Sequence, residues 1–394
     1  MAQDIPAGDA ADGVPGPADP VRCIPGDEAK TPRQGTGLCL SGGGFRAMLF
    51  HAGVLWRLNE AGRLPGLDRI SSVSGGSLTA GALARYWNAL DFGGTGVAAD
   101  FEALVVKPLR AMARRDIDIP AVLTGAALPA TSIADRVTKA YRQHLFGDVT
   151  LHDLPVRPRF VFNATNLGSG VLMRFSRPFL ADYRVGRVPD PTLPLAVAVA
   201  ASSAFPPFLS PCTVDLTGEN WITDPGNDLT GPEYRGRVRL TDGGVYDNLG
   251  LETVWKLYRT VLVSDGGGHL GAQADPHPDW PRQLLRVLDV VDNQVRALRK
   301  RQVIAALKSH ERDGLYLGIR SQVADYHLED PIPADPELTG RLAALPTRLA
   351  PLDDEQQDLL INWGYAICDT GLRRHQDGTL GRGTLPYPDR PLQR

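Results

Sequence analysis

The order of apolar and polar residues near the start of the chain predicts alternating strands and helices. The short apolar run at residues 37–41 is typical of a buried strand. Three glycines follow it, and residues 45–62 then carry apolar side chains at helical spacing. Residues 69–74 and 77–87 repeat the sequence of strand, tight turn and helix. This β-α-β-α order predicts an α/β fold with a mostly parallel central sheet and helices on both faces.

Three other segments do not continue this alternation. Residues 1–34 are rich in Pro, Gly, Asp and Ala and predict a disordered or irregular N-terminal arm. Residues 91–149 are helical in pattern and predict an insert or cap, whose apolar side chains beside arginines fit either an amphipathic helix packed on the sheet or a lipid interface. Residues 278–375 predict a helical C-terminal extension of one catalytic domain over 35–375, and 376–394 an irregular tail. Further strand-like runs lie at 159–165, 172–176, 238–241 and 260–264, and an alanine-rich helix at 195–204.

Composition excludes several classes of protein. The 394 residues carry a formal net charge of -3, which argues against a nucleic-acid binder. The basic residues are mostly Arg and are spread along the sequence, which indicates a compositional bias rather than a binding patch. The longest apolar stretch, 193–209, is broken by prolines and serines, so we expect no membrane span. No apolar segment follows the opening residues MAQDIPAGDAADG, so we expect no signal peptide, and a cytoplasmic protein, at most peripheral to membranes. The spacing of the cysteines predicts neither a disulfide framework nor a metal site: Cys23, Cys39, Cys212 and Cys368.

The first candidate for chemistry is the segment SVSGG at 72–76, between a predicted strand and a predicted helix. A serine at such a turn, here Ser74, is held out of the sheet beside a helix N-terminus that stabilises negative charge. The usual pattern is G-x-S-x-G, and Ser72 replaces its first glycine. The alternative is a structural one, in which Ser74 or Ser77 only caps the helix.

The second candidate is the segment SGGGFR at 41–46. Its glycines can direct backbone N–H groups at an anion, as an oxyanion hole requires. Phosphate-binding motifs of the P-loop or dinucleotide type are absent from the sequence. Arg46 opposes the helix dipole in the first turn, so it is either paired with a carboxylate or used on an anionic ligand.

The third candidate is an acid followed by glycines at the end of a predicted strand. Asp242, in TDGG, lies where ligand sites form in α/β sheets, although a D-G pair is commonly only a turn. Asp265, in DGGG, is a direct rival. A Ser, Asp and His triad is also formally possible with one of four histidines: His51, His269, His310 and His327.

Taken together and in this order, these motifs resemble the patatin-like phospholipase family, which shares its catalytic arrangement with the group IV cytosolic phospholipases A2. The resemblance rests on GGGFRA at 42–47, SVSGG at 72–76 and DGGVYDN at 242–248. NATN at 163–166 and AASSAFPP at 200–207 add to it. It covers about residues 37–265 and leaves the two ends and the 91–149 insert outside.

The resemblance implies a patatin-like three-layer fold with a Ser/Asp dyad and no histidine. Ser74 would be the nucleophile and Asp242 the base, and it is the run after Asp242 that favours this acid over Asp265. The oxyanion hole would be formed by four backbone N–H groups, chiefly those of Gly43 and Gly44. Gly42 and Gly75 would supply the other two, and Arg46 would support the hole. Neither a metal nor an organic cofactor would be needed.

The resulting hypothesis is a serine lipid acyl hydrolase of the phospholipase A or lysophospholipase type. Its partner would be a phospholipid or other acyl lipid at a membrane or micelle surface. The alternatives are an acyltransferase or small-ester carboxylesterase on the same fold, and a catalytically silent module that binds a lipid or a protein. The sequence predicts no head group, acyl position, chain length or oligomeric state.

Overall fold

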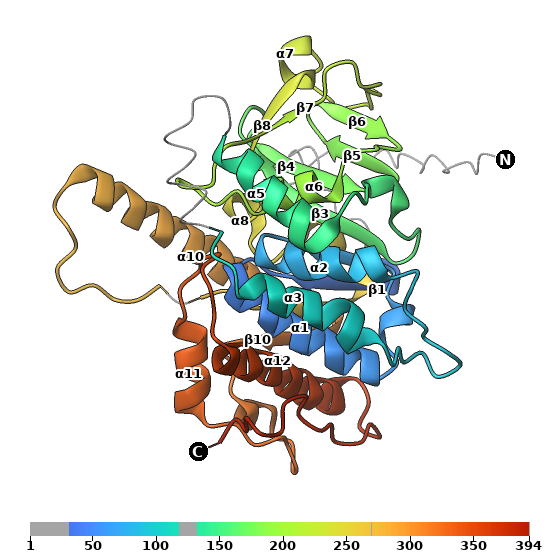
Figure 1. Ribbon diagram of the computed structural model, residues 1–394, viewed down its shortest axis with the longest axis vertical. Helices are drawn as coiled ribbons and strands as arrows, with labels where there is room; N and C mark the ends of the chain where they lie inside the picture. The colour runs from blue at the N-terminus through green and yellow to red at the C-terminus, as the bar shows by residue number, and fades with distance from the viewer. Residues whose placement is uncertain (1–30, 118–131, 269, 394) are drawn as a thin grey trace, which may run out of the picture.

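The structure is a computed structural model that describes residues 31–117, 132–268 and 270–393. A 10-stranded mixed sheet runs through it in the order β10-β9-β1-β2-β3-β4-β5-β6, with β7 and β8 joined to the edge of β3 (Figure 1). The strands are β1 Arg33–Leu40, β2 Arg69–Ser72, β3 Arg159–Asn166, β4 Val171–Ser176, β5 Phe179–Asp182, β6 Gly186–Pro189, β7 Cys212–Asp215, β8 Arg237–Asp242, β9 Tyr258–Asp265 and β10 Asp313–Gly318.

The helices surround this sheet. They are α1 Gly44–Glu60, α2 Gly75–Tyr86, α3 Lys107–Ala113, α5 Ile133–Tyr141, α6 Leu195–Ser202, α7 Pro232–Arg235, α8 Gly244–Asp247, α9 Glu252–Trp255, α10 Trp280–Lys308, α11 Pro336–Ala344 and α12 Asp354–His375. Shorter 3-10 or π turns cover Leu64–Gly66, Glu102–Val106, Arg142–Phe146, Leu151–Asp153 and Val323–Tyr326.

The sheet has a parallel half and an antiparallel half. The pairs β10–β9, β9–β1, β1–β2 and β2–β3 are parallel, as the sequence predicted for the segment that carries the motifs. Strands β4, β5 and β6 continue the sheet as antiparallel neighbours. The sequence did not predict β5, β6, β7 or β10, and β10 lies inside the segment expected to be helical.

Alternation along the central strands explains why helices cover both faces. Leu38 and Leu40 of β1 belong to the large core beneath α1, α2 and α12. Cys39, between them, belongs to a second core with α9 and the C-terminal half of α10. Successive residues of a strand point to opposite faces, so one apolar run supplies both cores. The expected helices on both faces are confirmed.

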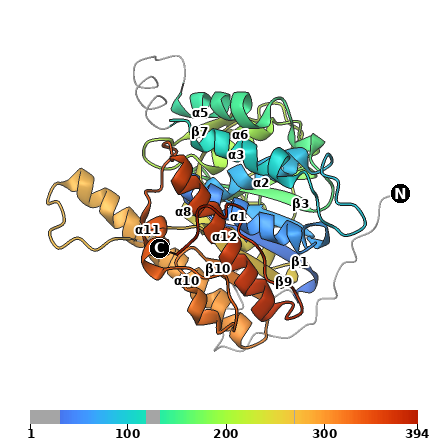
Figure 2. The same ribbon diagram turned by 60° about the horizontal axis from the view of Figure 1, so that its bottom comes forward.

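Two glycines let α1 and α12 approach closely on one of these faces. A methyl group at Gly53 would lie 1.9 Å from the carbonyl oxygen of Ile361, and one at Gly364 would lie 1.9 Å from the carbonyl oxygen of Phe50. Figure 2 shows α12 lying along α1 on the outside of the sheet. The C-terminal extension is thereby part of the main core.

The insert at 91–149 packs on the domain and contains no strand in its described residues. Val105, Val106, Leu109 and Met112 are fully buried in the main core. Arg110 forms a salt bridge with Asp358 of α12. This stretch is therefore a packed amphipathic helix, and the interpretation of its apolar side as a lipid interface is wrong. Residues 118–131 of the insert lie outside the described residues.

The two chain ends are described only in part. Most of the expected N-terminal arm, residues 1–30, lies outside the described residues, and β1 begins at Arg33, two residues earlier than the boundary expected for the arm. The tail from 376 has neither helix nor strand in its described part. It is tied to α12, because Asn362 hydrogen-bonds the backbone of Tyr387 and Arg390.

Candidate active site

The ends of β2 and β8 meet along one edge of β3. Strand β2 pairs in parallel with the first half of β3 and ends where Ser72 lies opposite Phe162. Strand β8 runs antiparallel along the second half of the same strand, and its last residue, Asp242, lies opposite Ala164. The two strands therefore arrive from opposite directions, and the residues that follow them face each other. This topology brings Ser74 and Asp242 together although 168 positions separate them in sequence.

Ser74 occupies a sharp turn between β2 and α2. Its backbone has φ 52° and ψ -120°, a conformation that non-glycine residues seldom adopt. Ser74 is the N-cap of α2 by position, but its side chain makes no capping hydrogen bond. The hydroxyl of Ser77 also does not cap the helix and instead bonds Ser72 and Ser202. The interpretation of these serines as simple helix caps is therefore wrong.

Ser72, the departure from G-x-S-x-G, fits the turn because its hydroxyl is satisfied there. Its Oγ accepts a hydrogen bond from the Ser77 hydroxyl at 2.9 Å and donates to the carbonyl of Val161 at 3.3 Å. Both groups are buried. A hydroxyl at this position is tolerated because it finds partners inside the fold rather than colliding with the chain.

Asp242 combines deep burial with an incomplete set of partners. Its Oδ1 accepts the backbone N–H of Gly244 at 2.7 Å. Its Oδ2 is buried and has no hydrogen-bond partner of ordinary geometry in the described part of the chain. Burial is the main cause that raises the pKa of Asp242, to about 7, and the charge of Asp292 on α10 also raises it. Hydrogen bonds from the Gly244 N–H and the Ser74 hydroxyl act in the opposite direction and lower the pKa. This carboxylate has one oxygen fixed by the turn and one free beside Ser74.

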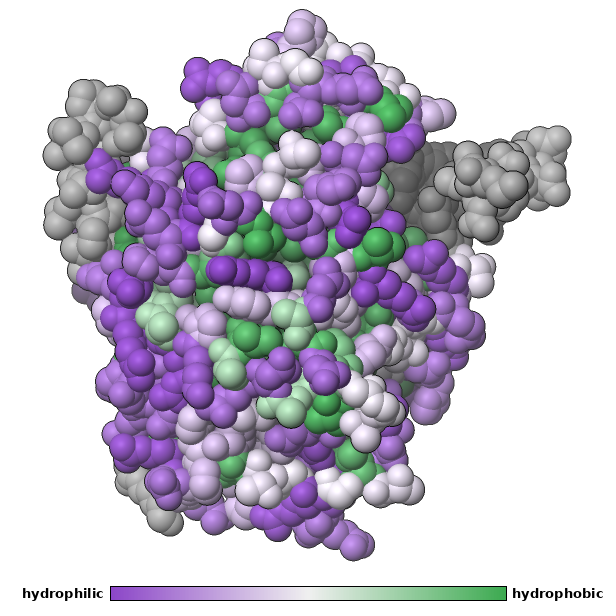
Figure 3. All heavy atoms as spheres, turned by 45° about the vertical axis from the view of Figure 1, so that its right-hand side comes forward, coloured by the Kyte–Doolittle hydropathy of each residue, from purple (hydrophilic) through white to green (hydrophobic). Residues whose placement is uncertain are grey.

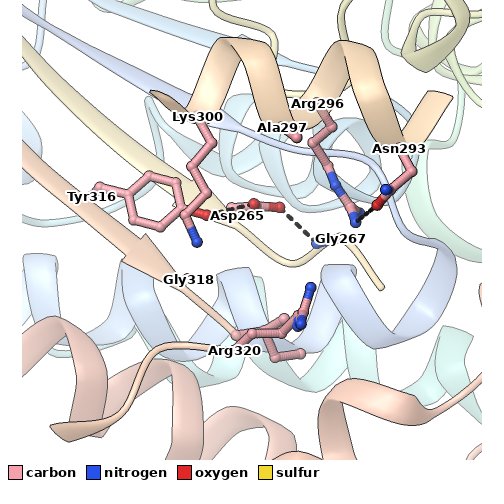
Figure 4. A pocket seen from close by; sticks show the side chains of 10 residues that line it. Asp265, Gly267, Asn293, Arg296, Ala297, Lys300, Tyr316, Gly318 and Arg320 are labelled. Carbon is pink, nitrogen blue, oxygen red and sulfur yellow. Dashed lines mark hydrogen bonds between the residues drawn. The ribbon is translucent and has the colours of Figure 1, made fainter. Parts of the chain in front are cut away.

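The rival acid has both of its oxygens occupied. Asp265 Oδ1 accepts the backbone N–H of Gly267 at 2.9 Å, and its Oδ2 accepts the hydroxyl of Tyr316 at 2.6 Å (Figure 4). It lies in a separate pocket of about 80 Å³ below α10, together with Arg296, Lys300 and other residues. Asp265 thus holds β9 to β10, whereas Oδ2 of Asp242 has no such partner among the described residues.

The glycine loop packs directly against the serine turn. A methyl group at Gly75 would lie 2.2 Å from the carbonyl oxygen of Gly44, and one at Gly42 would lie 3.2 Å from the Cβ of Ser74. Gly43 and Gly44 have φ of 145° and 62°, which favour glycine. The two segments predicted to form the site are adjacent because Gly42, Gly44 and Gly75 carry no side chain at the contact.

The glycine N–H groups are not equivalent. Gly42 donates its N–H to the carbonyl of Asn248 at 3.0 Å, so this group is not available to a ligand. The expectation that Gly42 supplies an oxyanion donor is therefore wrong. The N–H groups of Gly43, Gly44 and Gly75 have no hydrogen-bond partner among the residues that the structure describes. Gly44 and Gly75 are the first residues of α1 and α2, where N–H groups have no partner within the helix.

Arg46 is buried and bound to carbonyl and hydroxyl oxygens rather than to a carboxylate. Its Nε donates to the carbonyl of Gly266 at 3.1 Å, and its Nη atoms donate to the carbonyl of Leu345 and to the Thr347 hydroxyl. Burial lowers its pKa to about 10. Of the two alternatives for Arg46, pairing with a carboxylate is absent from its described surroundings, and its hydrogen bonds tie the glycine loop to the C-terminal extension.

No hydrogen bond joins a described candidate histidine to Ser74 or Asp242. His51 is fully buried and bonds the Ser264 hydroxyl at 2.7 Å and the Ser41 carbonyl at 2.9 Å. Burial lowers its pKa to about 4, so it is neutral. His310 precedes β10 in the sequence and His327 follows it, and His269 is outside the described residues.

Two residues that the sequence did not single out hold the two strand ends together. The carbonyl of Ser202 accepts the N–H groups of Ser74 and Gly243, and its hydroxyl donates to the carbonyl of Asn163 at 2.7 Å. The Asn163 side chain donates to Ser71 and Ser72 on β2. Both lie in the supporting segments of the resemblance, which was the only signal in the sequence for them.

The described residues lack two features that bear on cofactors and membranes. Within them, no cluster of three or more His, Cys, Asp or Glu side chains is arranged to hold a metal ion. No helix in the same part of the chain is long and apolar enough to cross a membrane.

Residues 38–255 match the family model for patatin-like phospholipase. The chain belongs to the patatin-like phospholipase family. The match includes the glycine loop, the serine turn and Asp242, and it extends over more than half of the chain.

Solved structures with a similar arrangement of elements include a human enzyme and a bacterial protein. Human GIVD cytosolic phospholipase A2 aligns with a TM-score of 0.49 and 13% identity over 86% of this chain. VipD from Legionella pneumophila aligns with a TM-score of 0.35 and 15% identity over 88% of this chain and 67% of its own. This patatin-like chain spans only 61% of the human structure. No curated protein sequence matches it.

Proposed function

We propose that this protein is a serine-dependent lipid acyl hydrolase in which Ser74 is the nucleophile and Asp242 the general base. The observation that carries the proposal is the free Oδ2 of Asp242, buried beside Ser74 with a raised pKa. Membership of the patatin-like phospholipase family supports a lipid ester as the substrate.

The chemistry starts with a proton transfer. A carboxylate with a pKa of about 7 is ionised in a large fraction of molecules at neutral pH and is a far better base than an ordinary aspartate. It takes the hydroxyl proton of Ser74 as Oγ attacks the ester carbonyl carbon. Oδ1 stays bonded to Gly244, so the carboxylate keeps its orientation while Oδ2 receives the proton.

The negative charge that develops on the carbonyl oxygen needs donors. The N–H groups of Gly43, Gly44 and Gly75 supply them beside the N-termini of α1 and α2, whose dipoles favour an anion. When the carbonyl re-forms, protonated Asp242 donates its proton to the departing alcohol. Water then attacks the acyl-Ser74 ester with Asp242 again as base, which releases the fatty acid and restores the hydroxyl.

A mixed membrane-lipid extract tests this proposal together with its substrate class. The wild-type protein is expected to release free fatty acid and the matching lysolipid or deacylated lipid, and Ser74→Ala is expected to release neither. Transfer of the acyl group to another alcohol in place of fatty acid release would show an acyltransferase. Unchanged lipids with both proteins would contradict the proposal.

A further inference from the structure

A pocket of about 80 Å³ lies between the C-terminal half of α10 and the carboxyl ends of β9 and β10. Three cationic side chains line it: Arg296 and Lys300 from α10, and Arg320 from the turn after β10. Figure 4 shows Arg296 and Lys300 reaching down from the helix, and Arg320 rising from the opposite side of the pocket. Three positive charges from two elements therefore converge on one hollow.

Exposed cations alone would not indicate a site in this protein. Hydrophilic side chains cover most of the face shown in Figure 3. Many of the described arginines form salt bridges, such as Arg184 with Asp228 and Arg187 with Asp224. By contrast, the cations of the pocket form no salt bridge with any residue that the structure describes. Their charges are left without a direct counter-ion.

Most of the hydrogen-bonding capacity of these cations is also unused. Arg296 donates to a backbone carbonyl in the glycine run after β9 and to the Asn293 side chain at 3.4 Å. Lys300 Nζ lies 4.9 Å from the centre of the Tyr316 ring. The side chain of Arg320 has no hydrogen-bond partner within the described ranges of the chain. Since an ammonium has three N–H donors and a guanidinium five, most donors remain free for a ligand.

One carboxylate also lines the pocket, and its charge opposes an anion. Asp265 accepts hydrogen bonds with both oxygens, as described above. Three cations and one carboxylate give the lining a net charge of +2. Beyond the lining, the charge of Arg296 acts on Arg46 and on Asp292, whose own charges are opposite and offset each other. The pocket therefore favours an anion despite its acid.

The shape of the pocket restricts the kind of anion. Its volume of about 80 Å³ exceeds the roughly 15 Å³ that one water needs, so it has room for a small polyatomic ion. The cations approach from two sides, so the ligand needs acceptor oxygens that point in different directions. A tetrahedral phosphate has them, whereas a planar carboxylate presents its two oxygens on one side.

We propose that this pocket binds a phosphate group, as inorganic phosphate or as the terminal phosphate of a phosphomonoester. Arg296, Lys300 and Arg320 hold its oxygens. The proposal departs, at this one place, from the expectation that the arginines reflect only a compositional bias.

The pocket is separate from the proposed active site but shares a loop with it. Neither Ser74 nor Asp242 belongs to its lining. Gly266, which precedes a lining residue, accepts a hydrogen bond from Arg46 and donates its N–H to the Ser41 hydroxyl. The loop that forms one wall of the pocket is thus bonded to both ends of the segment SGGGFR. Phosphate binding itself does not rest on the proposed function.

Isothermal titration calorimetry of the full chain with inorganic phosphate tests the proposal. We use Ser74→Ala throughout, so that no ligand is turned over, and expect saturable binding at concentrations up to about 10 mM. Lys300→Gln with Arg320→Gln should weaken binding roughly 100-fold, because two of three charge-assisted contacts are lost. Both side chains are exposed, so this double variant should remain folded, which thermal unfolding checks.

Arg301→Gln with Lys308→Gln is the matched control. These two residues are exposed on the same helix, lie outside the pocket lining and carry the same charge. We expect this variant to bind phosphate as tightly as the parent. Absence of saturable binding by the parent, or equal weakening in the two double variants, would overturn the proposal.

Amine-reactive labelling with mass spectrometry locates the bound ion without any substitution. Saturating phosphate should slow the modification of Lys300 several-fold and leave that of Lys308 unchanged. Binding without protection of Lys300 would place the ion elsewhere and contradict the proposal. Displacement of phosphate by an equal concentration of acetate would also contradict it, because the pocket would then not distinguish a phosphate from a carboxylate.

Dihexanoyl phosphatidic acid, used below the concentration at which it forms micelles, distinguishes the two sources of the phosphate group. Binding at least roughly tenfold tighter than that of inorganic phosphate would make a lipid head group the source. Equal affinities would make a soluble phosphate the source. A wild-type protein that binds phosphate but hydrolyses no ester would support this pocket and contradict the hydrolase.

Discussion

Ser202 accepts the backbone N–H of Ser74 with both its carbonyl oxygen, at 3.2 Å, and its hydroxyl oxygen, at 3.1 Å. The same carbonyl accepts the N–H of Gly243, one residue after Asp242. The end of α6 therefore fixes the serine turn and the aspartate turn to one point. The strained backbone of Ser74 persists because the surrounding hydrogen bonds determine its conformation.

Ser202→Ala should therefore lower kcat on soluble esters without a comparable change in KM. The substitution removes the hydroxyl that bonds Asn163, Ser77 and Ser74, and it should lower the free energy of unfolding by about 1–3 kcal/mol. Ser203→Ala is the matched control, because that hydroxyl bonds carbonyls of its own helix and Tyr141. Equal kcat losses in both variants would argue against a positioning role for Ser202.

Asp242→Asn should reduce ester hydrolysis by roughly 100- to 10,000-fold, because the amide cannot accept the Ser74 proton. The fold should be retained, since the carbonyl oxygen of Asn can still accept the Gly244 N–H. Asp265→Asn distinguishes the roles of the two acids. This variant should retain ester hydrolysis as long as it is folded. Full activity in Asp242→Asn with a dead Asp265→Asn would reverse the assignment.

The pKa of Asp242 predicts the pH dependence of kcat/KM. The base acts in its ionised form, so kcat/KM should rise as the pH increases through about 7 and level off above it. Asp292 raises this pKa by its charge, so Asp292→Asn should move the midpoint to lower pH. A profile with the midpoint of an ordinary carboxylate, near pH 4, would contradict a desolvated base.

The same group makes stability depend on pH. Because burial raises the folded-state pKa from 3.8 to about 7, the folded protein holds this proton more tightly than the unfolded chain. The resulting stabilisation is complete below the unfolded pKa and is lost as the pH rises through about 7. Asp242→Asn should thus unfold at a higher temperature than wild type at pH 8, with a smaller difference at pH 6. Calorimetry at both values checks the sign.

Gly75→Ala should lower kcat by at least roughly 100-fold, because its methyl group would collide with the Gly44 carbonyl at 2.2 Å and displace the oxyanion donors. Gly340→Ala on α11 is the control, since no atom lies within 4 Å of the added carbon. It should leave activity unchanged and stabilise the protein by about 0.5–1 kcal/mol. Comparable activity of the two variants would show that the glycine contact is unimportant.

The sequence predicted four strands of the parallel half, β1, β2, β3 and β9, because they are apolar runs, but it did not predict β10. It did not predict β5, β6 and β7, each of four residues, because such short strands depend on pairing with neighbours rather than on their own pattern. The pairing of β8 with β3 connects segments far apart in sequence, so no local signal in the sequence could place Asp242 beside Ser74.

At the site, the sequence predicted residue types but not which atoms were free. Gly42 looks like its two neighbours in sequence, and only the contact with Asn248 shows that its N–H is occupied. Asp242 and Asp265 have similar local sequences, and only Tyr316 distinguishes their oxygens. The sequence predicted that α10 is a helix, but it did not predict that the apolar side chains of its N-terminal half are exposed.

The most direct test of the central claim is labelling with a fluorophosphonate, followed by mass spectrometry to locate the modified residue. The account predicts one adduct, on Ser74, which is lost in Ser74→Ala and strongly slowed in Asp242→Asn. An unlabelled wild-type protein, or an adduct on any other serine, would contradict it.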